Sequence, residues 1–150
     1  YALTYAKKDC IGIDLINKRI EKANNKKSKK NLRNVHFIIA EANEFLNSLP
    51  NEFKCDNVVF LFPDPWPKKR HYKNRIMQAS FLEKLAMIMT NSGMLYFRTD
   101  NVDYFKWTSG LISSSKCWQI KEAPWLYESE TYFQNINKTY ESLVASVKLY

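Results

Sequence analysis

The sequence predicts an α/β fold, a mostly parallel sheet with helices on both faces. Short apolar runs alternate with longer segments whose apolar residues recur every three or four positions, and this alternation is typical of repeated strand and helix units. The runs lie at residues 10–15, 35–40, 58–62 and 94–98. An acidic residue stands at or just after the end of each run, which is where ligand-binding residues lie in a doubly wound sheet.

Length and composition fit one domain, residues 1–150. The chain has 150 residues, 45% of them apolar, which is enough for a single hydrophobic core. No apolar run approaches the length of about 18 residues that spans a bilayer, and no amino-terminal signal region is visible, so we expect a cytoplasmic protein. The net charge of +8 and the pI near 9.3 favour a polyanionic partner, nucleic acid rather than membrane.

The cysteines are widely spaced, at Cys10, Cys55 and Cys117. They lack the paired spacing of metal ligands and fit small buried side chains in a reducing compartment. We therefore expect no metal and assign these cysteines no chemistry.

At the start of the chain, residues 1–7 have the pattern of a helix. The strand at 10–15 follows and ends in Asp14. An aspartate at this place either caps the next helix or accepts the hydroxyls of a nucleoside ribose, and the residues alone leave both roles open. The next helix, at 16–27, is intensely basic, which is usual for a solvated face and also suits contact with a polyanion. Its basic residues and those just after it are Lys18, Arg19, Lys22, Lys26, Lys27, Lys29 and Lys30.

Two further strands and a short helix occupy the middle of the chain. The strand at 35–40 is followed by Glu41 and by a helix at 42–49. The run at 58–62 is unbroken and apolar, so we expect a strand buried on both faces of the sheet.

Beyond residue 75 the clearest helix spans 76–89, and a turn at 91–93 leads to the strand at 94–98. Asp100 comes next, either as a cap for the following helix or as a ligand-binding residue. In the last third we expect strands at 118–121 and 143–150, with an irregular excursion between them.

The loop after the strand at 58–62 is the most distinctive stretch. Pro63, Pro65 and Pro67 fix three backbone φ angles and remove three donors, so the chain must leave the sheet as a stiff loop. Asp64 lies between these prolines. A basic and aromatic run follows, a mixture that suits phosphate and base contacts, although a solvated loop has a similar composition. The run contains Trp66, Lys68, Lys69, Arg70, His71, Tyr72, Lys73 and Arg75.

These residues carry a resemblance to a known family. The stretch Phe-Pro-Asp-Pro-Trp-Pro-Lys-Lys-Arg-His at 62–71, with Arg98-Thr99-Asp100, closely resembles the bacterial tRNA (guanine-N7-)-methyltransferases. That family is similar in fold to the Rossmann-like class I methyltransferases, which use S-adenosyl-L-methionine. The resemblance implies methyl transfer to N7 of guanine 46 in the tRNA variable loop. A non-catalytic RNA-binding remnant and a class I methyltransferase with another substrate remain open.

The resemblance also implies roles for particular residues. Asp14 would hold the cofactor ribose, and Glu41, where the family commonly has aspartate, would contact the adenine end. Asp64 would be the catalytic residue and would also contact the cofactor, while Lys68 and Asp100 would bind the substrate guanine. RNA contacts would come from Arg70, His71, Tyr72, Lys73, Asn74 and Arg75.

Two features depart from the family pattern. The family's Thr-x-x-Glu motif matches residues 131–134, with Gln134 in place of the acid, so Thr131 and Gln134 are predicted to bind substrate. A rival register would put Lys138 and Glu141 at these places. The family's first strand and Gly-rich turn have no counterpart among the three glycines, so we expect an amino-terminally truncated methyltransferase domain.

Overall fold

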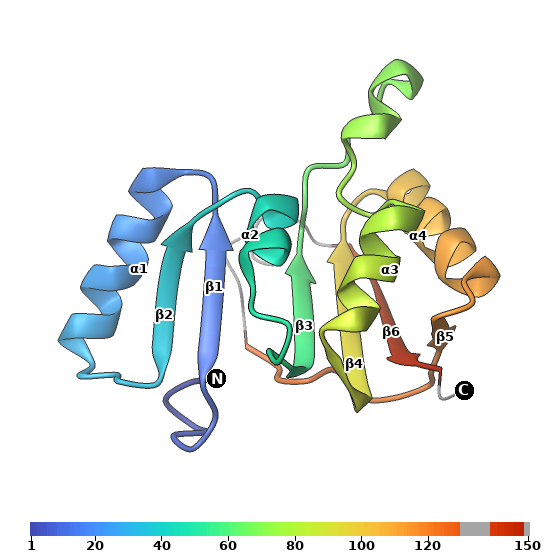
Figure 1. Ribbon diagram of the computed structural model, residues 1–150. Coiled ribbons are helices and arrows are strands. Elements are labelled where there is room, and N and C mark those ends of the chain that lie inside the picture. The colour runs from blue at the N-terminus through green and yellow to red at the C-terminus, as the bar shows by residue number, and fades with distance from the viewer. Residues whose placement is uncertain (130–138, 149–150) are drawn as a thin grey trace. The chain divides into compact units, whose positions relative to one another are not determined.

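The computed structural model describes residues 1–129 and 139–148 (Figure 1). The chain divides into two compact units, Tyr1–Leu49 and Pro50–Tyr150, called unit 1 and unit 2 below. Each unit is described by itself.

Unit 1 is built on a pair of parallel strands, β1 (Cys10–Asp14) and β2 (Val35–Ile39). Helix α1 (Asn17–Lys29) connects them and packs on one face of the pair, and α2 (Ala42–Ser48) follows β2 (Figure 1). Gly12 lies opposite Phe37 in the register, and a Cβ at Gly12 would stand 2.8 Å from the Phe37 ring. Close packing of that ring on β1 therefore requires glycine.

The predicted helix at residues 1–7 is wrong. The segment forms turns, in which Thr4 N and Tyr5 N both donate to the Tyr1 carbonyl at 2.9 Å. The Asn34 side chain accounts for the difference, because its amide donates to the carbonyls of Ala2, Tyr5 and Lys8 at 2.9–3.1 Å. A side-chain donor that takes up three backbone carbonyls replaces the bonds that a helix would form.

Unit 2 holds a mixed sheet in the order β3-β4-β6-β5. Strands β3 and β4 are parallel, whereas β6 runs antiparallel to both β4 and β5. The bounds are Cys55–Leu61 for β3, Met89–Thr99 for β4, Trp118–Ile120 for β5 and Glu141–Val147 for β6.

Two helices, α3 (Ala79–Met87) and α4 (Val102–Ser114), cover one face of this sheet (Figure 1). The contacts are aromatic: the ring centroids of Phe60 and Phe81 are 5.9 Å apart, and those of Phe97 and Tyr104 are 5.2 Å apart. Trp118, fully buried, adds a hydrogen bond from its indole N–H to the Leu82 carbonyl at 2.7 Å. The core of unit 2 therefore lies between α3, α4 and the sheet.

The strand buried on both faces is β4, not β3 as predicted. In β3, Val59 and Leu61 are 39% and 46% exposed, whereas residues 95–99 of β4 are all buried. The reason is that β3 is an edge strand of this sheet, while the second face of β4 is covered by Trp125, whose ring lies 5.5 Å from that of Tyr96.

Helix α3 begins three residues later than predicted, and β4 begins earlier. The Gln78 side-chain amide donates to the carbonyls of Tyr72 and Arg75 at 2.7 and 3.1 Å, which holds the preceding residues out of the helix. Residues 91–93 lie inside β4, where the register with β3 shifts, rather than in a turn. A Cβ at Gly93 would stand 2.8 Å from the Thr90 carbonyl oxygen, so the irregularity requires glycine.

Candidate active site

The segment 62–67, called the Asp64 loop below, leaves the carboxyl end of β3 (Figure 1). Phe62 and Trp66, on either side of Asp64, have φ angles of 50° and 44°. Positive φ is rare in bulky residues and costs about 1–3 kcal/mol each, so the surrounding structure must hold the loop in this shape. Strain of this kind is concentrated at functional sites.

The first end of the loop is held by β4 and by an aromatic ring. Phe62 N donates to the Arg98 carbonyl at 2.8 Å, and the Phe62 ring meets that of Tyr140 with centroids 6.1 Å apart. Asp64 itself is exposed and forms no hydrogen bond or ion pair within the described ranges. Its carboxylate is thus available to a ligand.

The second end of the loop is held by Arg75, which is only 1% exposed. Arg75 Nε donates to the Pro65 carbonyl at 2.8 Å, and Nη2 pairs with Asp103 Oδ2 at 2.5 Å. The guanidinium carbon lies 3.6 Å from the centroid of the Tyr72 ring. Arg75 therefore faces inward, in contrast to the surface contact that the sequence predicts for it.

Two tyrosines and one carboxylate complete this cluster. The Tyr72 hydroxyl donates to Asp103 Oδ2 at 2.7 Å, and this bond raises the pKa of Tyr72. Hydrogen bonds from Arg75 and Tyr72 lower the pKa of Asp103. Burial raises the pKa of Tyr104, beneath the guanidinium, to about 12. Asp103 is therefore held as a carboxylate that fixes both Arg75 and Tyr72 to the start of α4.

The rest of the basic run forms a short 3-10 helix, η1 (Lys69–Asn74), which projects beyond the end of β3 (Figure 1). His71 and Tyr72 are half-buried, and His71 accepts a hydrogen bond from Arg70 Nε at 3.2 Å. The other residues from 68 to 74 are exposed and can reach a polyanion: Lys68, Lys69, Arg70, Lys73 and Asn74.

Asp100 follows β4 as Asp64 follows β3. Leu61 and Arg98 are paired in the parallel register, so the two acids stand just beyond neighbouring strand ends of unit 2. The alternative role of Asp100 as a helix cap is wrong, because Asn101 caps α4, its side-chain oxygen accepting from Tyr104 N at 2.8 Å.

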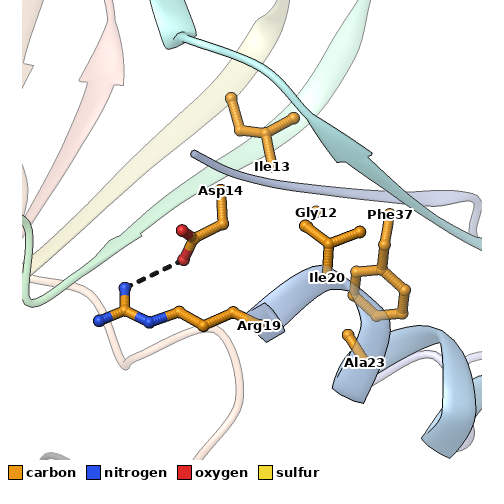
Figure 2. Close-up of a pocket in the computed structure, with 7 residues that line it drawn as sticks. All are labelled: Gly12, Ile13, Asp14, Arg19, Ile20, Ala23 and Phe37. Carbon is orange, nitrogen blue, oxygen red and sulfur yellow. Dashed lines mark hydrogen bonds and ion pairs between the residues drawn. The ribbon is translucent and has the colours of Figure 1, made fainter. Parts of the chain in front are cut away.

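In unit 1, Asp14 lines a cavity of about 240 Å³ at the end of β1 (Figure 2). Its Oδ1 accepts from Ile16 N at 2.8 Å, and its Oδ2 pairs with Arg19 at 3.1 Å. Figure 2 shows Arg19 reaching this carboxylate from α1, while Phe37 lies beside Gly12. Each carboxylate oxygen has two lone pairs, so Asp14 retains acceptor capacity for a ligand hydroxyl.

Glu41 has a capping role that sequence reasoning missed. It is the N-cap of α2, and its Oε2 accepts from Asn43 N and Glu44 N at 2.8 and 3.0 Å. Glutamate is uncommon at an N-cap, so the sequence offered no strong signal.

Arg98, quoted in the motif without a role, is also buried. It donates to Ser142 at 2.9 Å and to Glu128 at 3.1 Å, and its guanidinium lies 3.9 Å from the Trp125 ring centroid. The other predicted substrate residues, Thr131 and Gln134, lie outside the described residues, as does Lys138 of the rival register.

Across the parts of the chain that the structure describes, no helix is long and apolar enough to cross a bilayer. The same parts contain no group of three or more His, Cys, Asp or Glu side chains that could hold a metal ion.

Solved structures define the class of fold. An rRNA methylase from Streptococcus thermophilus matches 93% of this chain and 73% of its own, with a TM-score of 0.61 and 11% identity. The precorrin-6y C5,15-methyltransferase from Geobacter metallireducens GS-15 matches 92% of this chain and 65% of its own, with a TM-score of 0.59 and 12% identity. The fold is therefore that of the class I methyltransferases.

The family follows from the sequence. Residues 1–149 match the family described as "Putative methyltransferase", and the chain belongs to this family. Two relatives named tRNA (guanine-N(7)-)-methyltransferase are similar to it. The one from Prochlorococcus marinus (strain AS9601) is 30% identical over 132 residues, 86% of this chain and 63% of the relative. The one from Mycoplasmopsis pulmonis (strain UAB CTIP) is 33% identical over 123 residues, 81% of this chain and 60% of the relative.

The resemblance found in the motifs is thereby confirmed. The chain spans 60–63% of the length of these two relatives.

Proposed function

We propose that the chain transfers a methyl group from S-adenosyl-L-methionine to N7 of guanine 46 in the tRNA variable loop. The observation that carries this proposal is the Asp64 loop, an exposed carboxylate between two residues of positive φ at the end of β3. The names of the curated relatives supply the kind of base and RNA.

The reaction needs positioning and electrostatics rather than proton transfer. Guanine N7 carries a lone pair and no proton, so the N7–carbon bond can form as the sulfur–carbon bond breaks, and no base has to act. The cofactor supplies an electrophilic methyl group on a sulfonium sulfur. Positive charge then develops on the purine, and the Asp64 carboxylate offsets it.

Asp100 is suited to recognise the guanine. Its carboxylate can accept hydrogen bonds from N1–H and from the exocyclic amine on the Watson–Crick edge, which leaves N7 on the opposite side for reaction. Lys68, which is exposed just before η1, would contact the bound nucleotide. Thr131 and Gln134 are proposed for the same substrate through the family motif.

The cofactor contacts of unit 1 would come from Asp14 and Glu41. Asp14 fits this role, because its oxygens line a cavity and can accept bonds from ribose hydroxyls in addition to those from Ile16 and Arg19. In Glu41, Oε2 takes both backbone bonds of the cap, and Oε1 takes one at 3.3 Å from the Asn43 amide. Oε1 thus keeps acceptor capacity for the adenine end.

The RNA backbone would be contacted by the exposed members of the basic run, Arg70, Lys73 and Asn74, with His71 and Tyr72 beside them. Arg75 is not a member of this set, because its guanidinium is buried against Pro65 and Asp103.

The test is methyl transfer from tritium-labelled cofactor to tRNA transcripts, using the longest form of the chain that its gene encodes. We expect label in a transcript with guanine 46 and none in a matched transcript with adenine there. Label at another guanine would point to a different substrate. Tight tRNA binding without cofactor binding, measured by calorimetry, would favour an RNA-binding remnant.

A further inference from the structure

Arg75 ends a run of surface cations but does not share their environment. It is 1% exposed, and its guanidinium carbon lies over the Tyr72 and Tyr104 rings, 3.6 and 4.9 Å from their centroids. The neighbouring Lys73 and Asn74 are exposed. A phosphate group could reach those two side chains without any change in the fold, but not Arg75.

The partners of Arg75 lie on the two elements that frame the proposed active site. Nε donates to the carbonyl of Pro65, the residue after Asp64, at 2.8 Å. Nη2 pairs with Asp103, in the first turn of α4. Pro65 has no N–H, so its carbonyl is the one backbone polar group through which this residue can be held. The bond also fixes the peptide plane that leads into Trp66, whose φ is 44°.

Packing alone does not explain a charged residue here. A buried cation loses hydration, and the side chain of its partner Asp103 is 60% exposed, so solvent screens the attraction that would offset this loss. In addition, Arg75 Nη1 is buried and has no hydrogen-bond partner among the described residues, which is unfavourable. A favourable contact should therefore offset these two unfavourable contributions. The hydrogen bond from Arg75 to the strained loop is such a contact.

We propose that Arg75 is a positioning residue, whose guanidinium holds the Pro65 carbonyl and thereby fixes where the Asp64 carboxylate points. The first end of the loop is already tied to β4 through Phe62 N and the Arg98 carbonyl. Arg75 ties the second end, and Asp103 holds Arg75 in turn. This inference rests on the proposed function, in which Asp64 acts on the reacting guanine.

The test compares Arg75→Lys and Arg75→Met with the parent in single-turnover methyl transfer, in the longest form of the chain that its gene encodes. Lysine keeps the charge but cannot hold Pro65 and Asp103 together with a planar fork. We expect both variants to lose about ten- to a hundredfold in the rate at saturating tRNA and cofactor, as small misplacements do. Their tRNA dissociation constants should stay within twofold, with unchanged salt dependence.

Lys73→Ala is the matched control, because Lys73 is exposed on the same turn. It should weaken tRNA binding and reduce the slope of log affinity against log salt by about one unit. Asp103→Asn is an intermediate control, because it weakens the ion pair of Arg75 but leaves the hydrogen bond from Arg75 to Pro65 in place. Its rate should fall less than that of Arg75→Met, and the double variant should not show additive losses.

Two results would overturn the inference. If Arg75→Met lowers the salt slope by about one unit and keeps the parent rate at saturation, Arg75 contacts phosphate. If urea titration shows that the folded fraction explains the whole loss of rate, Arg75 only stabilises the fold. A parent that fails to methylate guanine 46 would refute the proposed function instead, and this outcome is separate from the other two.

Discussion

Asp64 stands between two residues of positive φ, and each end of its loop is held by a different contact of unit 2. The positions of Asp14, Asp64 and Asp100 could be predicted, because each follows an apolar run. What the neighbouring side chains bind could not be predicted. The burial of Arg75 depends on Asp103, 28 residues away, and a basic run gives no sign of which member turns inward.

The labelling rate of the Cys55 thiol tests whether the cysteines are inert. Burial, with a smaller contribution from Asp56, raises the pKa of the Cys55 thiol to about 11. We expect iodoacetamide to label Cys55 slowly at pH 8 in the native protein and quickly in urea, as followed by peptide mass spectrometry. Because the folded pKa exceeds the unfolded value, the contribution of this thiol to stability is complete below the unfolded value and is lost as the pH rises toward 11. Equal labelling rates in the two states would contradict the burial.

Alanine substitutions at Gly12 and Gly110 form a matched pair, whose effects on the free energy of unfolding should have opposite signs. A Cβ at Gly12 would stand 2.8 Å from the Phe37 ring, whereas a Cβ at Gly110 meets nothing within 4 Å. Gly12→Ala should therefore lower the free energy of unfolding by about 1–3 kcal/mol through overpacking. Gly110→Ala, in the exposed part of α4, should raise it by about 0.5–1 kcal/mol. Urea titration followed by circular dichroism measures both, and two effects of the same sign would show that the space at Gly12 is not limiting.

At the scale of elements, the strands were predicted well because short apolar runs between helical segments are a strong signal. The errors have local causes. The Asn34 amide holds residues 1–7 in turns, the Gln78 amide delays the start of α3, and the segment at 91–93 is a strand irregularity with the composition of a turn. In the first two cases a side-chain contact that no periodicity encodes overrides the pattern. The prediction of a buried β3 failed because a sequence run cannot show which strand becomes an edge.

Helix α1 carries a stripe of lysines at spacings of four and three residues, and in the described residues none of them forms an ion pair. Like charges four residues apart destabilise a helix by about 0.2–0.5 kcal/mol per pair. Changing all four to glutamine should raise the stability of α1 and weaken tRNA binding, with the salt slope falling by about one unit for each phosphate that is no longer neutralised. The four are Lys18, Lys22, Lys26 and Lys29.

The control for this variant is Lys106→Gln on α4, which is also exposed. Filter binding of tRNA at several salt concentrations supplies the slopes. An unchanged slope in the fourfold variant would show that the lysines of α1 only form a solvated face, which is the other interpretation that the composition of this helix allows.

At the scale of the whole molecule, the class I methyltransferase fold and the family could both be predicted from the sequence. The motif at 62–71 indicated the family, and the alternation of strands and helices indicated the fold. The net charge of +8 agrees with a polyanionic partner but does not locate it. The prediction of a single domain and the roles of Asp14, Glu41 and Asp100 stay predictions, because a carboxylate at a strand end is well placed for binding but does not show what it binds.

The proposed active site depends most on Asp64, and single-turnover methyl transfer by Asp64→Asn tests this role directly. Asparagine keeps the shape and one acceptor but removes the charge that would offset the developing cation. We expect the rate at saturating tRNA and cofactor to fall about ten- to a thousandfold, with tRNA affinity within twofold of the parent. Glu83→Gln, an exposed acid on α3, controls for the loss of one negative charge and should keep the parent rate. A rate for Asp64→Asn within twofold of the parent would make Asp64 a structural residue and contradict the assignment of the active site.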